Sequence, residues 1–230
     1  MKQKVCVILG VGSGNGISLA GKFSEENYAV VMCSRDTDKL NSYTAKIENS
    51  QAFEYDVTNI SDPEKIFNKI REKIGPVDVL IYNAGAGQFA NIDNATLDGF
   101  QNAWEVNARG LFLAAGEVIS DMRKSGGGNI VVIGATASLR GGANFLPFAS
   151  AKAAQRSLAQ SMARKLGPEN IHVSYVIIDG VIDKDRKNRI EPDDSLMNPD
   201  HIADSVYFLT QQQKSAWTFE LDLRPFREKW

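Results

Sequence analysis

Residues that commonly ligate metals or form disulfides are scarce in this sequence, which has two cysteines and two histidines among 230 residues. Cys6 and Cys33 each lie inside an apolar run typical of a buried strand, so we expect two buried free thiols, with a disulfide or a redox role as the alternative. His172 and His201 are far apart in the chain, and no group of histidine, cysteine and carboxylate residues has the spacing of metal ligands. We therefore expect no metal site.

The sequence also lacks a large excess of charge of either sign and any long apolar run. The net charge is -2 and the isoelectric point is about 5.8, so nothing indicates a basic surface for nucleic acid. No apolar run reaches the roughly 18 residues that a membrane-spanning helix needs. The N-terminal stretch MKQKVCVILG is basic and then apolar, like a signal peptide, but a glycine-rich turn follows it in place of a cleavage site. We interpret it as a first strand and expect a cytoplasmic protein that binds neither nucleic acid nor membranes.

Buried strands and amphipathic helices are predicted to alternate from one end of the chain to the other. Apolar, β-branched runs predict the strands, and apolar residues at helical spacing predict the helices between them. This alternation predicts one α/β domain over residues 1–230, with a doubly wound parallel sheet of about seven strands and helices on both faces. The strands are expected at 4–10, 28–33, 51–57, 77–85, within 125–134, at 171–178 and at 217–223, and the helices at 16–27, 37–49, 62–75, 98–124, 148–166 and from 199 onward.

A glycine-rich segment, GVGSGNG at residues 10–16, links the first strand to the first helix. Glycines let the backbone turn tightly and approach a phosphate closely, and the start of a helix supplies unpaired N–H groups and a positive dipole. The segment predicts a site for the pyrophosphate of a dinucleotide, and a tight turn without a ligand is the alternative. The residues expected at this site are Gly10, Gly12, Ser13, Gly14, Asn15 and Gly16.

The second strand ends in CSRD, where a dinucleotide bound to such a sheet places its adenosine ribose. A carboxylate directly at that end would bind the two ribose hydroxyls and repel a 2′-phosphate. Ser34 stands there and Arg35 follows it, and a hydroxyl with a guanidinium suits a phosphate. We therefore expect NADP rather than NAD, with a solvated Arg35 at the start of a helix as the alternative.

These motifs, in this order, resemble the short-chain dehydrogenase/reductase family, and the resemblance covers nearly the whole chain. The family's Gly-x-x-x-Gly-x-Gly pattern falls on Gly10, Gly14 and Gly16, although Leu9 stands where a threonine is usual. The resemblance implies a Rossmann-like fold, a nicotinamide dinucleotide cofactor and the interconversion of a small carbonyl compound and its alcohol. It implies catalytic roles for Lys152 and Asn107, and it extends the cofactor-binding set to Asp56, Val57, Asn83, Ala84, Gly85, Lys152, Gly180 and Ile182.

The sequence departs from the family pattern at the positions that carry its proton chemistry. The family tyrosine falls on Phe148 and the family serine on Ala135; a proline is replaced by Asp179, and a threonine by Lys184. In the family, the tyrosine exchanges a proton with the substrate oxygen, the lysine lowers the pKa of the tyrosine and holds the ribose hydroxyls, the serine orients the carbonyl, and the asparagine holds a water. Proton transfer by a positioned group contributes roughly 10²–10⁴ in rate, so its loss would be large.

Other residues near these positions have groups that can exchange a proton. Thr136 and Ser138 follow Ala135 closely, Asp179 follows the sixth strand, and a desolvated Lys152 could donate a proton directly. The alternative for Thr136, Ser138 and Asp179 is that they cap loops or are solvated.

The segment DKDRKNRIEPDD, residues 183–194, is rich in charge. By the resemblance it belongs to a substrate lid at 183–198, and a solvated flexible loop is the alternative. The segment lacks an apolar stripe, so a small or polar substrate is expected.

Two hypotheses about function follow. The first is an NADP-dependent short-chain oxidoreductase with an altered proton-transfer site. The second is a catalytically inactive dinucleotide-binding protein that acts as a sensor or as a subunit of an oligomer. In either case we expect self-association as a homodimer or homotetramer, because the helices at 98–124 and 148–166 are rich in small and apolar residues and because Phe226 and Trp230 lie at the terminus.

Overall fold

The computed structural model describes residues 3–185 and 193–228. Its centre is a seven-stranded sheet in which every pairing is parallel and the strand order is β3-β2-β1-β4-β5-β6-β9. The chain winds outward from β1 in one direction and from β4 in the other, so the order reverses between these two strands. This confirms the predicted doubly wound sheet. The strands are β1 (Val5–Leu9), β2 (Ala29–Ser34), β3 (Ser50–Glu54), β4 (Val79–Tyr82), β5 (Gly128–Ile133), β6 (Ile171–Ile178) and β9 (Glu220–Leu223).

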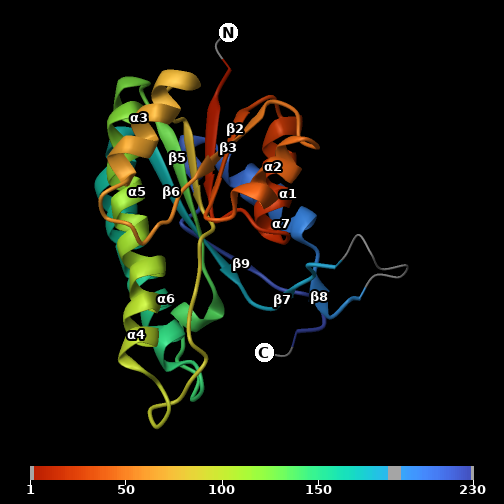
Figure 1. The fold of residues 1–230 in the computed structure, drawn as a ribbon, viewed down its shortest axis with the longest axis vertical. Coiled ribbons are helices and arrows are strands. Elements are labelled where there is room, and N and C mark those ends of the chain that lie inside the picture. The colour runs from red at the N-terminus through yellow and green to blue at the C-terminus, as the bar shows by residue number, and fades with distance from the viewer. Residues whose placement is uncertain (1–2, 186–192, 229–230) are drawn as a thin grey trace.

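Helices cover both faces of the sheet, as the sequence predicts (Figure 1). One face packs against α1 (Asn15–Glu25), α2 (Thr37–Thr44) and α7 (Pro199–Thr210), and the other against α3 (Pro63–Lys73), α5 (Gly110–Lys124) and α6 (Leu146–Leu166). Strands β1, β4 and β6 are buried along their whole length, because a parallel sheet with helices on both faces keeps little contact with water. No helix of the described residues is both long and apolar enough to span a bilayer.

The two cysteines lie on opposite faces of this sheet. Cys6 packs into the core beneath α1 and α7, whereas Cys33 packs into the core beneath α3 and α5. Both thiols are free and buried, as expected, and burial raises the pKa of Cys33 to about 12. A buried neutral thiol is unreactive, so these residues are part of the hydrophobic core. Within the described residues, no group of three or more histidine, cysteine or carboxylate side chains is placed to hold a metal.

The predicted helix at 98–124 is interrupted at Asn107. α4 (Leu97–Trp104) is followed by a π-helical turn, Glu105–Arg109, and α5 begins only at Gly110. The side chain of Asn107 donates from Nδ2 to the carbonyl oxygen of Ala103 at 2.8 Å, which is the oxygen that its own backbone N–H would use in a regular helix. Such π-turns occur often at functional sites.

Other boundaries also differ from the sequence expectation. The helix expected at 37–49 ends at Thr44, because the carbonyl of Tyr43 accepts from the backbone of both Lys46 and Ile47 in a tight turn that leads into β3. A small second sheet, which the sequence did not indicate, pairs β7 (Val181–Ile182) with β8 (Leu196–Met197). Two-residue strands carry no detectable periodicity, so sequence patterns cannot find them.

Candidate functional site

A cleft follows the carboxyl ends of the central strands. A cavity of about 1110 Å³ lies over the glycine-rich segment and α6, and a cavity of about 370 Å³ lies over the ends of β2 and β3. The two cavities share Gly10, Gly12, Lys39, Asn83 and Gly85, so we treat them as one cleft with a larger and a smaller part. A cleft at the point where strand order reverses is where ligands of this architecture bind.

The glycine-rich segment is shaped to leave the start of α1 open. Gly10 has φ +87°, and a Cβ added there would lie 2.5 Å from the backbone of Ala84; a Cβ on Gly16 would lie 2.6 Å from Cα of Val11. Gly12, in contrast, faces open space. No side chain caps α1 and no acidic residue lies in its first turn. The N–H of Ile17 donates to the carbonyl of Gly12 at 3.1 Å, and the dipole and the preceding N–H groups of the helix start are available to an anion. These features fit the pyrophosphate of a dinucleotide.

The smaller part of the cleft is lined by two basic and two acidic side chains, Arg35, Lys39, Asp36 and Asp56. Ser34 and Arg35 line it, and Arg35 is exposed and makes no side-chain hydrogen bond or ion pair with the described residues. The nearest carboxylate, Asp36, is engaged by α2: its Oδ1 accepts from the backbone N–H of Lys39 at 3.0 Å and its Oδ2 lies 3.7 Å from the Nζ of Lys39. Asp36 therefore acts as a helix cap.

Residues that follow the carboxyl ends of β3 and β4 also line the cleft. Asp56 accepts from the backbone and the hydroxyl of Thr58 at 2.9 and 2.8 Å, which fixes its carboxylate beside the smaller part. Asn83 donates from Nδ2 to the carbonyl of Gly10 at 2.7 Å, so it ties the phosphate loop to β4. Gly85 follows, and a Cβ on it would lie 3.6 Å from both Oδ1 of Asn107 and Nζ of Lys152.

Lys152, on α6, is a buried amine that borders the larger part of the cleft. Its Nζ donates to the carbonyl of Ile133 and to Oε1 of Gln155, both at 3.0 Å. An ammonium has three N–H groups, so one is left for the cleft. Burial lowers the pKa of Lys152 to about 7, because a low-dielectric site disfavours the charged form.

Gln155 connects this lysine to Asn107. It is fully buried, and its Nε2 donates to the backbone carbonyl of Asn107 at 2.9 Å. The hydroxyl of Tyr175 lies 3.4 Å from Oε1 of Gln155, behind Gly134, and burial raises the pKa of Tyr175 to about 12. Asn107 is held by its amide, which donates to Ala86 at 2.6 Å, while its buried Oδ1 has no hydrogen-bond partner in the described structure.

Phe148 and Ala135 stand beside Lys152 in the wall of the cleft. The Nζ of Lys152 lies 5.9 Å from the centre of the Phe148 ring, within the range of a cation–π contact. Gly87 packs closely against Phe148, because a Cβ there would lie 2.6 Å from Cδ2 of Phe148. Neither Phe148 nor Ala135 can exchange a proton.

The hydroxyl and carboxyl groups proposed as substitutes are bound elsewhere. Thr136 donates from Oγ1 to Oδ1 of Asp179 at 2.6 Å, and the other oxygen of Asp179 lies 3.3 Å from the guanidinium of Arg224. Ser138 donates to the carbonyl of Ala135 at 2.7 Å. Lys152 therefore combines a position on the cleft with a pKa of about 7.

Comparison with known proteins agrees with this geometry. The family model for short chain dehydrogenases matches residues 4–194. The chain belongs to the short-chain dehydrogenase family. A relative, 7alpha-hydroxysteroid dehydrogenase of Escherichia coli (strain K12), is 30% identical over 221 residues, which are 90% of this chain and 86% of that protein.

Solved structures of short-chain dehydrogenases have the same fold. The structure of a short-chain dehydrogenase from Rhodopseudomonas palustris superposes with a TM-score of 0.87 at 35% identity, covering 98% of this chain and 100% of that one. The alcohol dehydrogenase of the archaeon Thermococcus sibiricus, complexed with 5-hydroxy-NADP, superposes with a TM-score of 0.88 at 24% identity, covering 99% of each chain.

The structure brings the predicted short-chain dehydrogenase cofactor residues together. Gly10, Gly12, Ser13, Gly14, Asn15, Gly16, Asn83, Gly85, Lys152, Gly180 and Ile182 line the larger part of the cleft, and Ser34, Arg35, Asp56, Val57 and Ala84 line the smaller part. Asn107 does not line the cleft; it lies behind Gly85, in the π-helical turn. Lys184 lies beside the phosphate loop, with its Cγ 3.5 Å from a Cβ position on Gly14.

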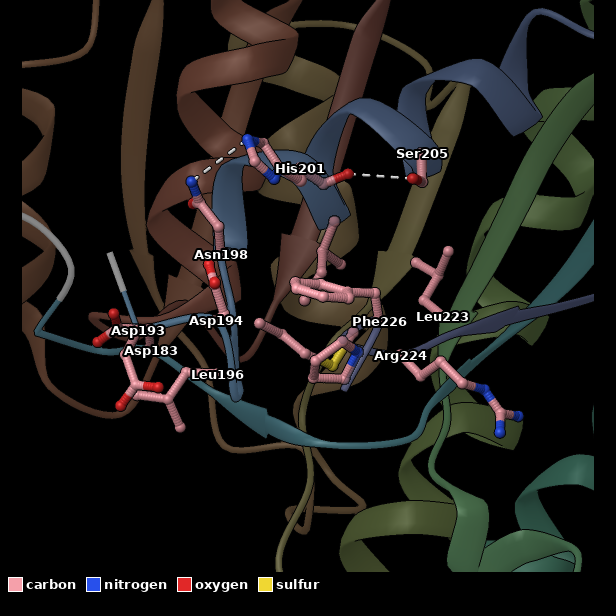
Figure 2. A pocket seen from close by; sticks show the side chains of 13 residues that line it. Asp183, Asp193, Asp194, Leu196, Asn198, His201, Ser205, Leu223, Arg224 and Phe226 are labelled. Carbon is pink, nitrogen blue, oxygen red and sulfur yellow. Dashed lines mark hydrogen bonds between the residues drawn. The ribbon is translucent and has the colours of Figure 1, made fainter. Parts of the chain in front are cut away.

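The expected lid at 183–198 is only partly within the described residues, since 186–192 lie outside them. Lys184 lines the cleft, but Asp193 and Met197 line a separate cavity of about 450 Å³ near the C-terminal strand. Figure 2 shows this second cavity, with Asp183 and Asp193 at one end, Arg224 at the other, and a hydrogen bond between Asn198 and His201 on its wall. The cavity of Figure 2 and the larger part of the cleft share no lining residue. A lid over the cleft, formed by residues 183–198, therefore stays a prediction.

Sequence reasoning missed several residues of the cleft. Gln155 stands three residues after Lys152 and seven after Phe148. This spacing places it on the same face of the helix as Lys152, and it could have indicated a contact between the two side chains. Phe89, Phe145 and Arg140 also line the larger part of the cleft. They lie in loops, where sequence periodicity carries no information about which way a side chain faces.

Proposed function

We propose that this short-chain dehydrogenase is an NADP(H)-dependent oxidoreductase that interconverts a small carbonyl compound and its alcohol, with Lys152 as the proton-transfer group. The observation that carries this proposal is the buried amine of Lys152, which borders the cleft with one N–H not used by the protein. When bound, the nicotinamide ring would supply or accept the hydride.

The cofactor would be held by residues that line the two parts of the cleft. The N–H groups at the start of α1 would bind the pyrophosphate, and Asn15, whose buried Oδ1 has no hydrogen-bond partner in the described structure, borders the same place. Arg35 and Ser34 would bind the 2′-phosphate, because a charge-assisted contact to phosphate is stronger than a neutral one. The same fold holds 5-hydroxy-NADP in the Thermococcus sibiricus protein.

Lys152 would protonate the carbonyl oxygen during reduction. The ammonium gives one proton to the oxygen as hydride reaches the carbon, so the substrate becomes an alcohol and Lys152 becomes a neutral amine that solvent then reprotonates. In the reverse direction the neutral amine accepts the proton. A group with a pKa of about 7 exists in both forms near neutral pH, which is what general acid–base catalysis requires.

Phe148 is compatible with this role. The ring of Phe148 cannot exchange a proton, so it leaves Lys152 as the acid, whereas a phenol at the same place would compete with it. Thr136 and Ser138 donate their hydroxyl protons to other protein groups, so they are engaged before a substrate arrives.

The variant Lys152→Met tests this proposal. With NADPH and a panel of activated aldehydes, diketones and quinones, the 340 nm absorbance should fall with the parent, and kcat of the variant should be lower by about 10²-fold or more. NADPH affinity, measured separately by calorimetry, should change much less. If kcat is retained and only the affinity for NADPH falls, Lys152 binds cofactor without transferring a proton.

The second hypothesis, a dinucleotide-binding protein without turnover, is separated from the first by the same measurements. Tight binding of NADPH by the parent, with no change in 340 nm absorbance on the whole panel, would favour a sensor or an oligomer subunit. Failure to bind either NADPH or NADH would contradict both hypotheses.

Self-association is part of the proposal, and the exposed faces of α4 and α5 support it. Trp104 is 46% exposed and Phe112 is 63% exposed, with Phe100 and Leu97 also exposed near them in sequence. Apolar side chains that gather on one surface commonly mark an interface. Phe226 is exposed at the C-terminal end, whereas Trp230 lies outside the described residues.

A further inference from the structure

Three phenylalanines form one wall of the larger part of the cleft. The ring of Phe89 lies between the other two, with its centre 5.2 Å from that of Phe145 and 5.5 Å from that of Phe148, in edge-to-face arrangements. Phe89 is 68% exposed and Phe145 42% exposed, although both are large apolar side chains that line the cavity. We call these residues the phenylalanine wall. Its exposed ring surface offers a planar aromatic ligand both area and edge-to-face contacts.

Four basic residues line the larger part of the cleft. Three of them lie near the proposed cofactor site or are hydrogen-bonded to the protein. Lys184 lies beside the phosphate loop, and Lys39 borders both parts of the cleft near the adenosine end. Lys152 is held by Ile133 and Gln155. Arg140 is the fourth.

Arg140 lies in the loop that joins β5 to the phenylalanine wall. Its neighbours in the sequence, Gly141 and Gly142, line the cavity with it. The guanidinium makes no hydrogen bond or ion pair with any described residue, and its side chain is exposed. A planar guanidinium with free donors matches a carboxylate, which it can bind through two parallel N–H groups.

The rest of this end of the cleft offers little else to a polar substrate. No aspartate or glutamate is among the described residues that line the larger part. The nearby hydroxyls of Thr136 and Ser138 are engaged by Asp179 and by the backbone. A substrate would therefore be recognised by aromatic contacts and by the guanidinium of Arg140.

From this arrangement we infer that the substrate is an aromatic carbonyl compound with a carboxylate, such as a carboxybenzaldehyde. The phenylalanine wall and Arg140 would hold it. The inference names the substrate class of the proposed oxidoreductase, and it rests on that proposed function. The aromatic ring packs on Phe89, the carboxylate pairs with Arg140, and the carbonyl oxygen faces Lys152.

Binding of an unreactive product analogue tests the inference without turnover. The probes are 4-(hydroxymethyl)benzoate and its neutral methyl ester, titrated by calorimetry into the protein alone and into the protein with NADPH. An alcohol with the reduced cofactor cannot react, so only binding is measured. The carboxylate should bind up to about fivefold more tightly than the ester, because an ion pair with an exposed guanidinium contributes up to about 1 kcal/mol.

Two variants identify the source of the preference. Arg140→Gln should bind the carboxylate and the ester equally, whereas Phe89→Ala should weaken both probes by about the same factor. Both side chains are exposed, so neither change should unfold the protein. Arg164→Gln is the matched control, since Arg164 is an exposed arginine of α6 that does not line the cleft, and it should keep the preference of the parent.

The outcomes separate this inference from the proposed function. A carboxylate preference that Arg140→Gln abolishes supports the inference, even if no carbonyl on any panel is reduced. Equal binding of the two probes by the parent, or a preference that persists in Arg140→Gln, overturns it, even if NADPH-dependent reduction of neutral carbonyls is fast. Reduction of 4-carboxybenzaldehyde with a KM that rises in Arg140→Gln, while the KM for its methyl ester is unchanged, supports both.

Discussion

Replacing Gln155 with methionine should move the pH dependence of carbonyl reduction to lower pH. Oε1 of Gln155 accepts a hydrogen bond from Nζ of Lys152 at 3.0 Å, and both side chains are buried. A hydrogen bond to a charged group contributes about 1.5–3 kcal/mol, and one pKa unit corresponds to about 1.36 kcal/mol. Loss of the acceptor should therefore lower the pKa of Lys152 from about 7 by about 1 to 2 units.

The assay is the pH dependence of kcat for reduction with NADPH, followed at 340 nm. The ammonium is the donor, so kcat of the parent should be constant at low pH and fall about tenfold per pH unit above the pKa. In Gln155→Met the fall should begin at lower pH. Tyr175 is the other titratable group of the described residues that contacts Gln155, and its pKa of about 12 keeps it protonated throughout this range.

A second variant should shift the profile in the opposite direction. Gln155→Glu places a carboxylate next to Lys152, which should raise the lysine pKa by about 1–3 units. Both variants lose the hydrogen bond that Nε2 of Gln155 donates to the carbonyl of Asn107, and both should be less stable by about 1–3 kcal/mol. A general loss of packing would therefore affect both variants alike, whereas the expected pKa shifts of Lys152 have opposite signs. Gln160→Met, on the same helix and without a hydrogen bond in the described structure, is the control. Profiles that coincide with that of the parent would refute the role of Gln155.

The remaining predictions concern cofactor choice, the proton donor and assembly. Arg35→Ala should lose most of the preference for NADP(H) over NAD(H), about tenfold or more in affinity, and equal affinity for the two cofactors in the parent, measured by calorimetry, would contradict the role of Arg35. Phe148→Tyr combined with Ala135→Ser should reduce a generic diketone or quinone at least about tenfold faster than the parent, because a phenol beside Lys152 is a second acid; a folded, NADPH-binding double variant without any gain would show that the pocket suits other chemistry. Phe112→Glu should yield monomers in light scattering where the parent gives an oligomer, and a monomeric parent at micromolar concentration would rule out self-association.

The parallel sheet and the position of the cleft could be predicted because their signals are local and repeated. Each strand is a short apolar run between turn residues. The segment at 10–16 needs glycine for its backbone geometry, because Gly10 has a positive φ and Gly16 has no space for a side chain. A helix start such as Asp62-Pro63 is readable for the same reason. The strand order that places Gly10 beside Ala84 then brings distant motifs together at one edge.

The parts that could not be predicted depend on contacts between distant residues. The π-helical turn at Asn107 forms because one side-chain amide takes a backbone carbonyl, which no apolar pattern reveals. The low pKa of Lys152 follows from burial that only the assembled fold defines. The engagement of Asp179 by Arg224 joins residues 45 positions apart, so the sequence could not show that this carboxylate is occupied.

The pH dependence of NADPH oxidation by the parent and by Lys152→Met, with the best carbonyl of the panel, shows whether Lys152 is the proton donor. We expect kcat of the parent to be constant below a pKa of about 7 and to fall above it, and the residual rate of Lys152→Met to stay unchanged with pH over the same range. A parent that reduces carbonyls with a flat profile between pH 5 and pH 9, roughly two units on either side of that pKa, or a Lys152→Met variant that keeps the parent's rate and profile, would contradict this role of Lys152.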